Sequence, residues 1–148
     1  MHDAQPLPVD RQRPRIALRQ ADQQALLAIA YGGLLSDARS AGALLFEVSR
    51  ADIVSDAEPS MTISLGSRVL FRDDRAASPQ WITLVHPRLA RADAGEVSVL
   101  TPLGAALIGL SKGQNIRCPD RHGGELSLTI MEVSPPPSKA LERRLEPK

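Results

Sequence analysis

The run VSVLTPLGAALIGLSKGQNI, residues 97–116, constrains the fold of this chain more than any other stretch. Its first valines alternate with a serine, as in a half-buried strand. Thr101 followed by Pro102 has the pattern of a helix N-cap and a first helical residue. Leucines and alanines then recur at helical spacing as far as Gly113, which can leave a helix with positive φ. The run therefore predicts a strand, a tight turn and a short helix that ends at Gly113.

Two further helices are expected near the start of the chain. Residues 20–31 and residues 37–51 each carry an apolar stripe at helical spacing. A short connection joins them, so the two stripes are best buried against each other in an antiparallel hairpin. The hairpin should turn at a tip formed by Gly32, Gly33, Leu34, Ser36 and Asp37, with the two glycines providing a left-handed exit from the first helix.

The remainder of the chain reads as strands and turns. Besides residues 97–99, strands are expected at 62–65, 67–72, 80–85, 115–118 and 125–133. The predicted class is α+β, with a short N-terminal antiparallel helical hairpin followed by a mainly antiparallel sheet and one short helix. We divide the chain into four parts: a disordered tail (1–15), the hairpin (16–58), the sheet domain (59–134) and a proline-rich charged tail (135–148).

Composition excludes several classes of protein. The 148 residues include 18 Lys and Arg against 17 Asp and Glu, so the net charge of +1 gives no bulk electrostatic reason for direct nucleic-acid binding. A single cysteine rules out an internal disulfide, which suits a reducing cytoplasm. No segment has the length and apolarity of a signal peptide core or a membrane span. We expect a soluble cytoplasmic protein, with a monomer as the default state.

Side chains that carry enzyme chemistry are scattered. His2, His86 and His122 have no metal-ligand spacing, and each is expected at the surface. Cys118 has no basic partner nearby in sequence, so it is expected to be a small core residue rather than a nucleophile. Because no glycine-rich phosphate loop is present either, we predict no metal, no cofactor and no catalytic activity.

The organising run resembles a segment of the Gre transcript-cleavage factors and of the regulator of nucleoside diphosphate kinase (Rnk). The shared pattern is Ser-Val-Leu-Ser/Thr-Pro-x-Gly-x-Ala-Leu-x-Gly-Leu-x-x-Gly, and SRVLFRD (67–73) with TLVHP (83–87) resembles the first two strands of the same domain. The resemblance, closer to Rnk than to Gre, implies an FKBP-like carboxy-terminal domain. The alternative is an unrelated α+β domain with a proline-capped helix.

An FKBP-like fold raises the possibility of prolyl isomerase activity. Those enzymes line their pocket with aromatic rings, whereas this chain has only Tyr31, Phe46, Phe71 and Trp81, two of them in the helical part. We therefore do not expect isomerase activity.

The resemblance also bears on transcript cleavage. In Gre factors it implies a long coiled coil that enters the secondary channel of RNA polymerase and presents acidic residues that help to hold a catalytic Mg²⁺. The first helix expected here spans only about 20 Å at about 1.5 Å per residue. Its tip offers one carboxylate, Asp37, which serves equally well as the N-cap of the second helix. Transcript cleavage is therefore not expected.

Docking of the family on polymerase is attributed to its Ser-Pro turn, which corresponds here to Leu100, Thr101 and Pro102, followed by Leu103. An exposed leucine and a rigid proline at a helix start would form a low-entropy apolar contact. The alternative is that Leu100 is a core residue and Thr101 only a cap. The chain departs from the family in having Thr101 for the commoner serine, and Pro135–Pro137 for the usual aromatic and acidic ending.

These observations lead to two functional hypotheses. The first is a non-enzymatic transcription regulator that binds RNA polymerase near the secondary channel and competes with Gre factors without stimulating cleavage. The alternative is a Gre-like domain reused as a protein-interaction or ligand-binding module, independent of polymerase.

Overall fold

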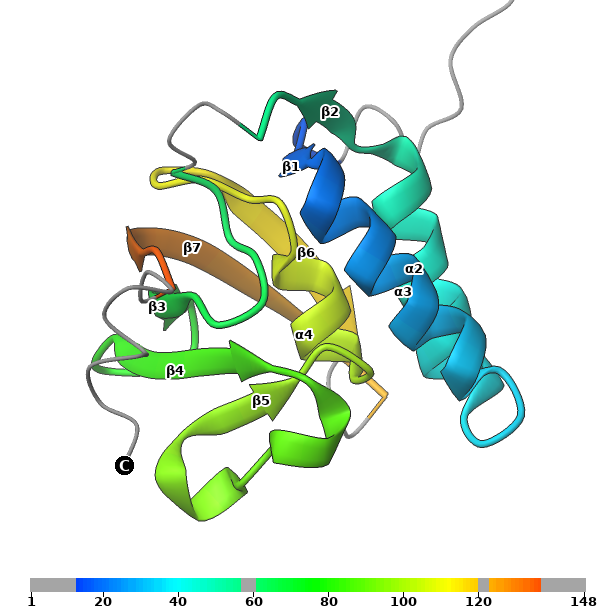
Figure 1. Cartoon of the computed structure of the whole chain (residues 1–148). Coiled ribbons are helices and arrows are strands. Elements are labelled where there is room, and N and C mark those ends of the chain that lie inside the picture. The colour runs from blue at the N-terminus through cyan, green and yellow to red at the C-terminus, as the bar shows by residue number, and fades with distance from the viewer. Residues whose placement is uncertain (1–12, 57–60, 120–122, 137–148) are drawn as a thin grey trace, which may run out of the picture.

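The computed structural model describes residues 13–56, 61–119 and 123–136. Three helices and seven strands follow one another there: β1 (Ala17–Arg19), α2 (Gln20–Gly33), α3 (Ala38–Arg50), β2 (Asp52–Val54), β3 (Arg68–Asp73), β4 (Gln80–Val85), β5 (Glu96–Ser98), α4 (Pro102–Leu107), β6 (Asn115–Pro119) and β7 (Glu125–Ser134). Two 3-10 turns, Pro87–Leu89 and Ala92–Ala94, join β4 to β5. Helices α2 and α3 pack side by side at one side of the molecule (Figure 1). The α+β class is confirmed.

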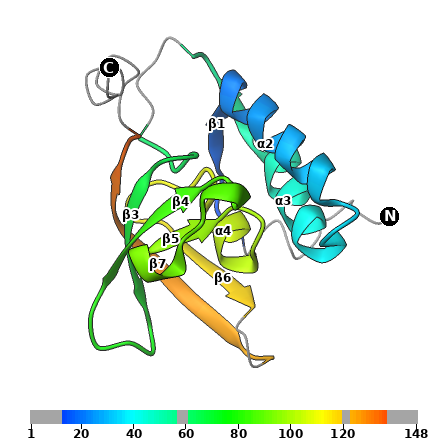
Figure 2. The same ribbon diagram turned by 60° about the horizontal axis from the view of Figure 1, so that its bottom comes forward.

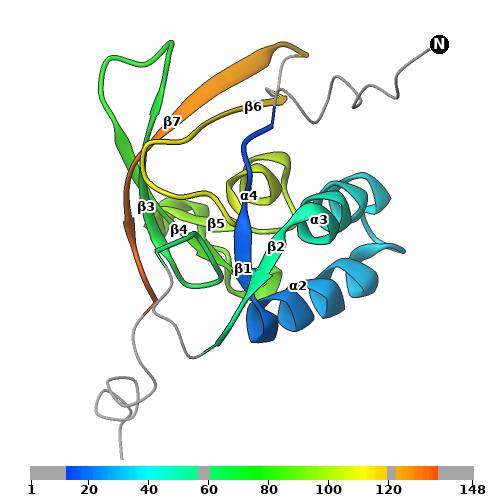
Figure 3. The ribbon, with the colours of Figure 1, turned by 90° about the horizontal axis from the view of Figure 1, so that it is seen from above.

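The larger sheet has the strand order β5-β4-β3-β7-β6. β3 pairs antiparallel with β4 and with β7, β6 pairs antiparallel with β7, and β5 runs parallel to β4. The sheet curls around α4, which lies between it and the hairpin (Figures 2 and 3). The alternation along β3 shows that one face of the sheet is buried and the other is not: Val69 and Phe71 are buried, whereas Arg68 and Arg72 are exposed.

The expected strand at residues 62–65 is reduced to one bridge, between Thr62 and Ser111. Ile63 and Ser64 are both buried, which an alternating strand does not allow. Instead, the backbone of Ile63 donates to Leu110 and accepts from Gly109. This segment therefore braces the chain that follows α4.

A second, two-stranded sheet joins the two ends of the hairpin. β1 pairs in parallel with β2, and the amide of Ala17 donates to the carbonyl of Gly109. The sequence did not indicate this sheet, because three-residue strands are too short to show a period. Because the register pairs Ala17 with Asp52 and Arg19 with Val54, the start of β1 lies beside the end of α3, and the start of α2 lies beside the end of β2 (Figure 3).

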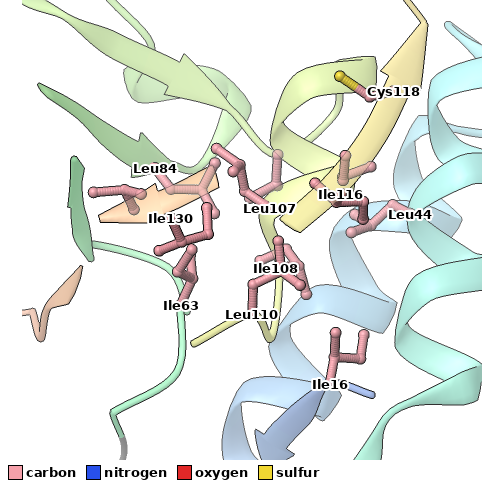
Figure 4. Packing of buried hydrophobic residues seen from close by; sticks show 14 of the residues in the cluster. Ile16, Leu44, Ile63, Leu84, Leu107, Ile108, Leu110, Ile116, Cys118 and Ile130 are labelled. Atoms are coloured by element: carbon pink, nitrogen blue, oxygen red, sulfur yellow. The ribbon is translucent and has the colours of Figure 1, made fainter. Parts of the chain in front are cut away.

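One buried cluster runs from the hairpin to the sheet. Leu107 and Ile108 lie between Leu84 and Ile130 of the sheet and Leu44 of α3 (Figure 4). The last residues of the expected tail also take part in packing, since Arg13 pairs with the buried Glu47 of α3 and Arg50 donates to the carbonyl of Pro14. The hairpin and the sheet domain thus share a core, while the boundary proposed near Glu58 and most of both tails lie outside the described residues.

Helix α4 is shorter than the sequence predicted. It ends at Leu107, and Ile108 is already extended, so the expected exit at Gly113 is wrong. The cause is tertiary: Gly109, with φ of 78°, donates to Ile63 and accepts from Ala17, which draws the chain out of the helix. Gly113 does have positive φ, but in the turn that precedes β6.

The left-handed exit expected at the tip is also wrong. α2 continues through Gly32 and Gly33, and neither glycine has positive φ. Gly33 is buried because Leu100 packs on it: a Cβ at Gly33 would lie 2.8 Å from Leu100 Cδ1. Gly33 is thus a site of close approach between the hairpin and the sheet domain.

We predict that two glycine-to-alanine substitutions have opposite effects on stability. A Cβ at Gly104 would lie 2.1 Å from the carbonyl oxygen of Ser98, which is backbone and cannot move aside. Gly104→Ala should therefore lower the free energy of unfolding by about 3 kcal/mol or more. A Cβ at Gly32 would have no neighbouring atom within 4 Å. Gly32→Ala should therefore raise the free energy of unfolding by about 0.5–1 kcal/mol, because alanine has the higher helix propensity.

Chemical denaturation followed by circular dichroism measures both changes. If Gly104→Ala proved as stable as the wild type, α4 would not approach the end of β5 as described.

Candidate functional site

The turn at residues 100–103 is held by short-range hydrogen bonds. Thr101 Oγ1 donates to the carbonyl oxygen of Ser98 (2.7 Å) and accepts from the amide of Gly104 (3.0 Å), which confirms the predicted N-cap. The amide of Leu100 donates to Ser98 Oγ (3.0 Å). Pro102 occupies the first helical position, where its missing N–H costs no hydrogen bond. The turn is therefore fixed before any partner arrives.

The four residues of this turn have different surroundings. Pro102 is exposed, whereas Leu100, Thr101 and Leu103 are half-buried. Leu100 and Leu103 pack against the core, and Leu100 also touches Gly33. The apolar contact expected here thus consists of an outward proline and two leucines that present only part of their surface.

Two hollows flank the turn. The first, which we call the α3–α4 groove, has a volume of about 530 Å³ and lies between α3, α4 and β6; Phe46, Pro102 and Arg117 are among its walls. The second, the tip groove, has a volume of about 370 Å³ and is lined by Gly32, Gly33, Ser36 and Leu100, together with the turn at His86, Pro87 and Arg88. The tip residues and the 100–103 turn therefore share one surface.

The tip of the hairpin is apolar. Leu35 is fully exposed, Tyr31 and Leu34 are also exposed, and residues 31–37 contain one carboxylate. That carboxylate, Asp37, accepts from the amide of Ser40 (3.1 Å) as the N-cap of α3. Hydrogen bonds from the backbone and from the side chain of Ser40 lower the pKa of Asp37. The side chain that could have bound a metal is engaged in helix capping.

Several groups at this surface had no signal in the sequence. His86 Nδ1 accepts from the amide of Arg88 and so orders one wall of the tip groove. The guanidinium of Arg13 lies 5.0 Å from the centre of the Phe46 ring in the α3–α4 groove. The His86 contact is local, to a residue two positions on, whereas the Arg13–Phe46 contact joins distant parts of the chain and depends on tertiary packing.

The residues considered for enzyme chemistry are not brought together. Cys118 is buried in the core, as predicted. His86 caps the 3-10 turn Pro87–Leu89, which follows β4. His2 and His122 lie outside the described residues. In the described ranges, no three His, Cys, Asp or Glu side chains gather as metal ligands. The helices described there include none that is long and apolar enough to cross a membrane.

Comparison with known proteins shows the family of the chain. Residues 58–135 match the family model described as "Transcription elongation factor, GreA/GreB, C-term". The chain therefore belongs to the GreA/GreB carboxy-terminal family, and the 100–103 turn lies within the matched residues.

Individual relatives refine the assignment. The chain is 31% identical over 134 residues to the "Regulator of nucleoside diphosphate kinase" of Escherichia coli K12, covering 86% of this chain and 95% of that protein. It is 31% identical over 131 residues to "Transcription elongation factor GreA" of Chloroflexus aggregans, covering 82% and 83%. A solved GreA/GreB structure from Nitrosomonas europaea superposes with a TM-score of 0.65 at 30% identity, covering 82% of this chain and all of that one. The resemblance to Rnk is confirmed.

We predict a pH-dependent contribution of Asp37 to stability. Its pKa is lowered in the folded chain, so the cap stabilises α3 above the ordinary carboxyl pKa and is lost as the pH falls through the lowered value. Asp37→Ala should melt at a lower temperature than wild type at pH 7, and the gap should shrink below about pH 4.

Asp37→Asn is the matched control, because asparagine caps a helix without ionising. Its melting temperature should stay close to that of wild type at pH 7. A gap for Asp37→Ala that is unchanged at low pH would show that the carboxylate charge does not contribute to the cap.

Proposed function

We propose that this chain is a non-enzymatic transcription regulator of the Rnk type, which docks on RNA polymerase near the rim of the secondary channel. In this proposal it competes with Gre factors for their docking surface and does not stimulate transcript cleavage. The 100–103 turn is the docking element, on an FKBP-like domain, and the protein acts in the cytoplasm as a monomer. Family membership and the fixed, outward Pro102 support the docking assignment.

The length and composition of the hairpin tip support the proposal that the protein does not stimulate transcript cleavage. α2 has 14 residues, which span about 20 Å at about 1.5 Å per residue. Its end presents Tyr31, Leu34 and Leu35, and the single carboxylate there caps α3. A tip that is short, apolar and without a free carboxylate has no means of holding Mg²⁺ at a distant active centre.

The proposal is tested by titrating purified protein into a stalled, backtracked RNA polymerase complex in the presence of a Gre factor. Cleavage should slow to a saturating limit, because the two proteins share one docking surface. The protein alone should produce no cleavage above the intrinsic rate of the polymerase. If the protein neither slows cleavage nor retains polymerase in a pull-down, the fold has been kept for another partner and the proposal fails.

Pro102→Asp should abolish polymerase binding while leaving the fold intact. Aspartate is well tolerated in the first turn of a helix, where its charge interacts favourably with the helix dipole, so the melting temperature should change little. The exposed apolar ring is lost and a charge is placed at the contact. Polymerase affinity measured by biolayer interferometry reports the effect, with Pro102→Ala as the milder variant. Unchanged affinity of Pro102→Asp would remove the turn from the docking surface.

A further inference from the structure

The α3–α4 groove combines an apolar floor with a basic rim. Ala43, Ala105, Ala106 and Pro119 contribute apolar surface, and Phe46 stands on one wall with 43% of its surface exposed. Arg39 at the start of α3 and Arg117 on β6 line the groove from opposite sides. Open apolar surface beside like-charged side chains is typical of an interaction site.

The positive charge of the rim is not neutralised from within the groove. Glu47, the one carboxylate that lines it, is 3% exposed and already pairs with Arg13 and with Arg50. In the ranges 13–56, 61–119 and 123–136 Arg39 makes no ion pair, although its charge contributes, after the hydrogen bonds from Ser40, to the lowered pKa of Asp37. Arg117 reaches Glu125 only at 3.8 Å, and both side chains are mostly exposed. Two arginines therefore remain available to an acidic partner.

The groove is continuous with the proposed docking turn, because Pro102 forms part of its wall. A partner that covers the exposed face of Pro102 would also lie over the mouth of the groove. An open trough between two helices and an edge strand suits the side chains of an extended or helical protein segment.

We propose that the α3–α4 groove receives a segment of RNA polymerase that presents apolar side chains flanked by carboxylates. The apolar side chains lie on the floor beside Phe46, and the carboxylates pair with Arg39 and Arg117. This inference rests on the proposed function and adds to it the chemistry of the contact, which is acidic as well as apolar. It also gives α3 of the hairpin a part in docking.

The test is the affinity of purified RNA polymerase for the full-length chain, measured at several salt concentrations. The double variant Arg39→Glu/Arg117→Glu reverses both rim charges. Arg39 lies in the first turn of α3, where glutamate suits the helix dipole, and Arg117 is exposed, so the variant should fold. Arg72→Glu/Arg91→Glu makes the same change in net charge at exposed arginines that do not line the groove.

We expect the rim variant to bind at least about tenfold more weakly than wild type and with a shallower dependence on salt, while the control variant stays within about twofold. Equal losses in the two double variants would overturn the inference, because the groove would then have no special role. Unchanged affinity of the rim variant would overturn it as well and would leave the proposed function standing. Failure of the wild type to bind would instead remove the proposed function, and the inference with it.

Melting curves of both double variants establish that any loss of binding arises from the folded protein.

A third variant tests the apolar half of the contact. Ala43 is exposed and lines the groove, so Ala43→Trp should fill it and weaken binding without a change of charge. If Ala43→Trp binds as tightly as wild type, the partner does not enter the groove.

Discussion

The close approach of α4 to the end of β5 is the constraint on which the rest of this surface depends. Gly104 leaves room for the backbone of Ser98, and Thr101 ties the two together by donating to the Ser98 carbonyl and accepting from the Gly104 amide. In the chain between them, Pro102 is exposed and Leu100 packs toward the hairpin, against Gly33. A larger residue at position 104 would separate helix from strand and move both side chains.

The hairpin is held to the sheet domain by the same geometry. Leu100 packs on Gly33 near the tip, and at the other end β1 pairs with β2 and bonds to Gly109. Leu44 of α3 joins the cluster around Leu107, so the hairpin contributes to the core rather than extending as a free arm. Short helices that are fixed along their length hold the tip beside the 100–103 turn. This arrangement suits the proposed function, in which the protein covers a docking surface and does not reach the catalytic centre of the polymerase.

Local patterns were sufficient for much of the fold. The cap at Thr101, the stripe of α3 and the alternation of β3 depend on near neighbours in the sequence, and the structure confirms them. The errors arose where distant segments act on the backbone. Gly109 ends α4 early through bonds to Ile63 and Ala17, and Gly33 at the end of α2 allows Leu100 to pack closely rather than forming a turn. The two grooves were not predictable, because their walls come from residues as far apart as Arg39 and Arg117.

We propose a regulator that keeps the docking surface of its family and lacks a catalytic tip. The central claim of this proposal is that the tip stays at the rim of the secondary channel when the domain is bound to RNA polymerase. The most direct measurement places a hydroxyl-radical source at the fully exposed position 35, through Leu35→Cys and a tethered iron chelate, since the native Cys118 is buried. Cleavage of polymerase confined to the entrance of the secondary channel is the predicted result. Cuts beside the catalytic centre would show that the tip reaches the site of chemistry and would contradict the account.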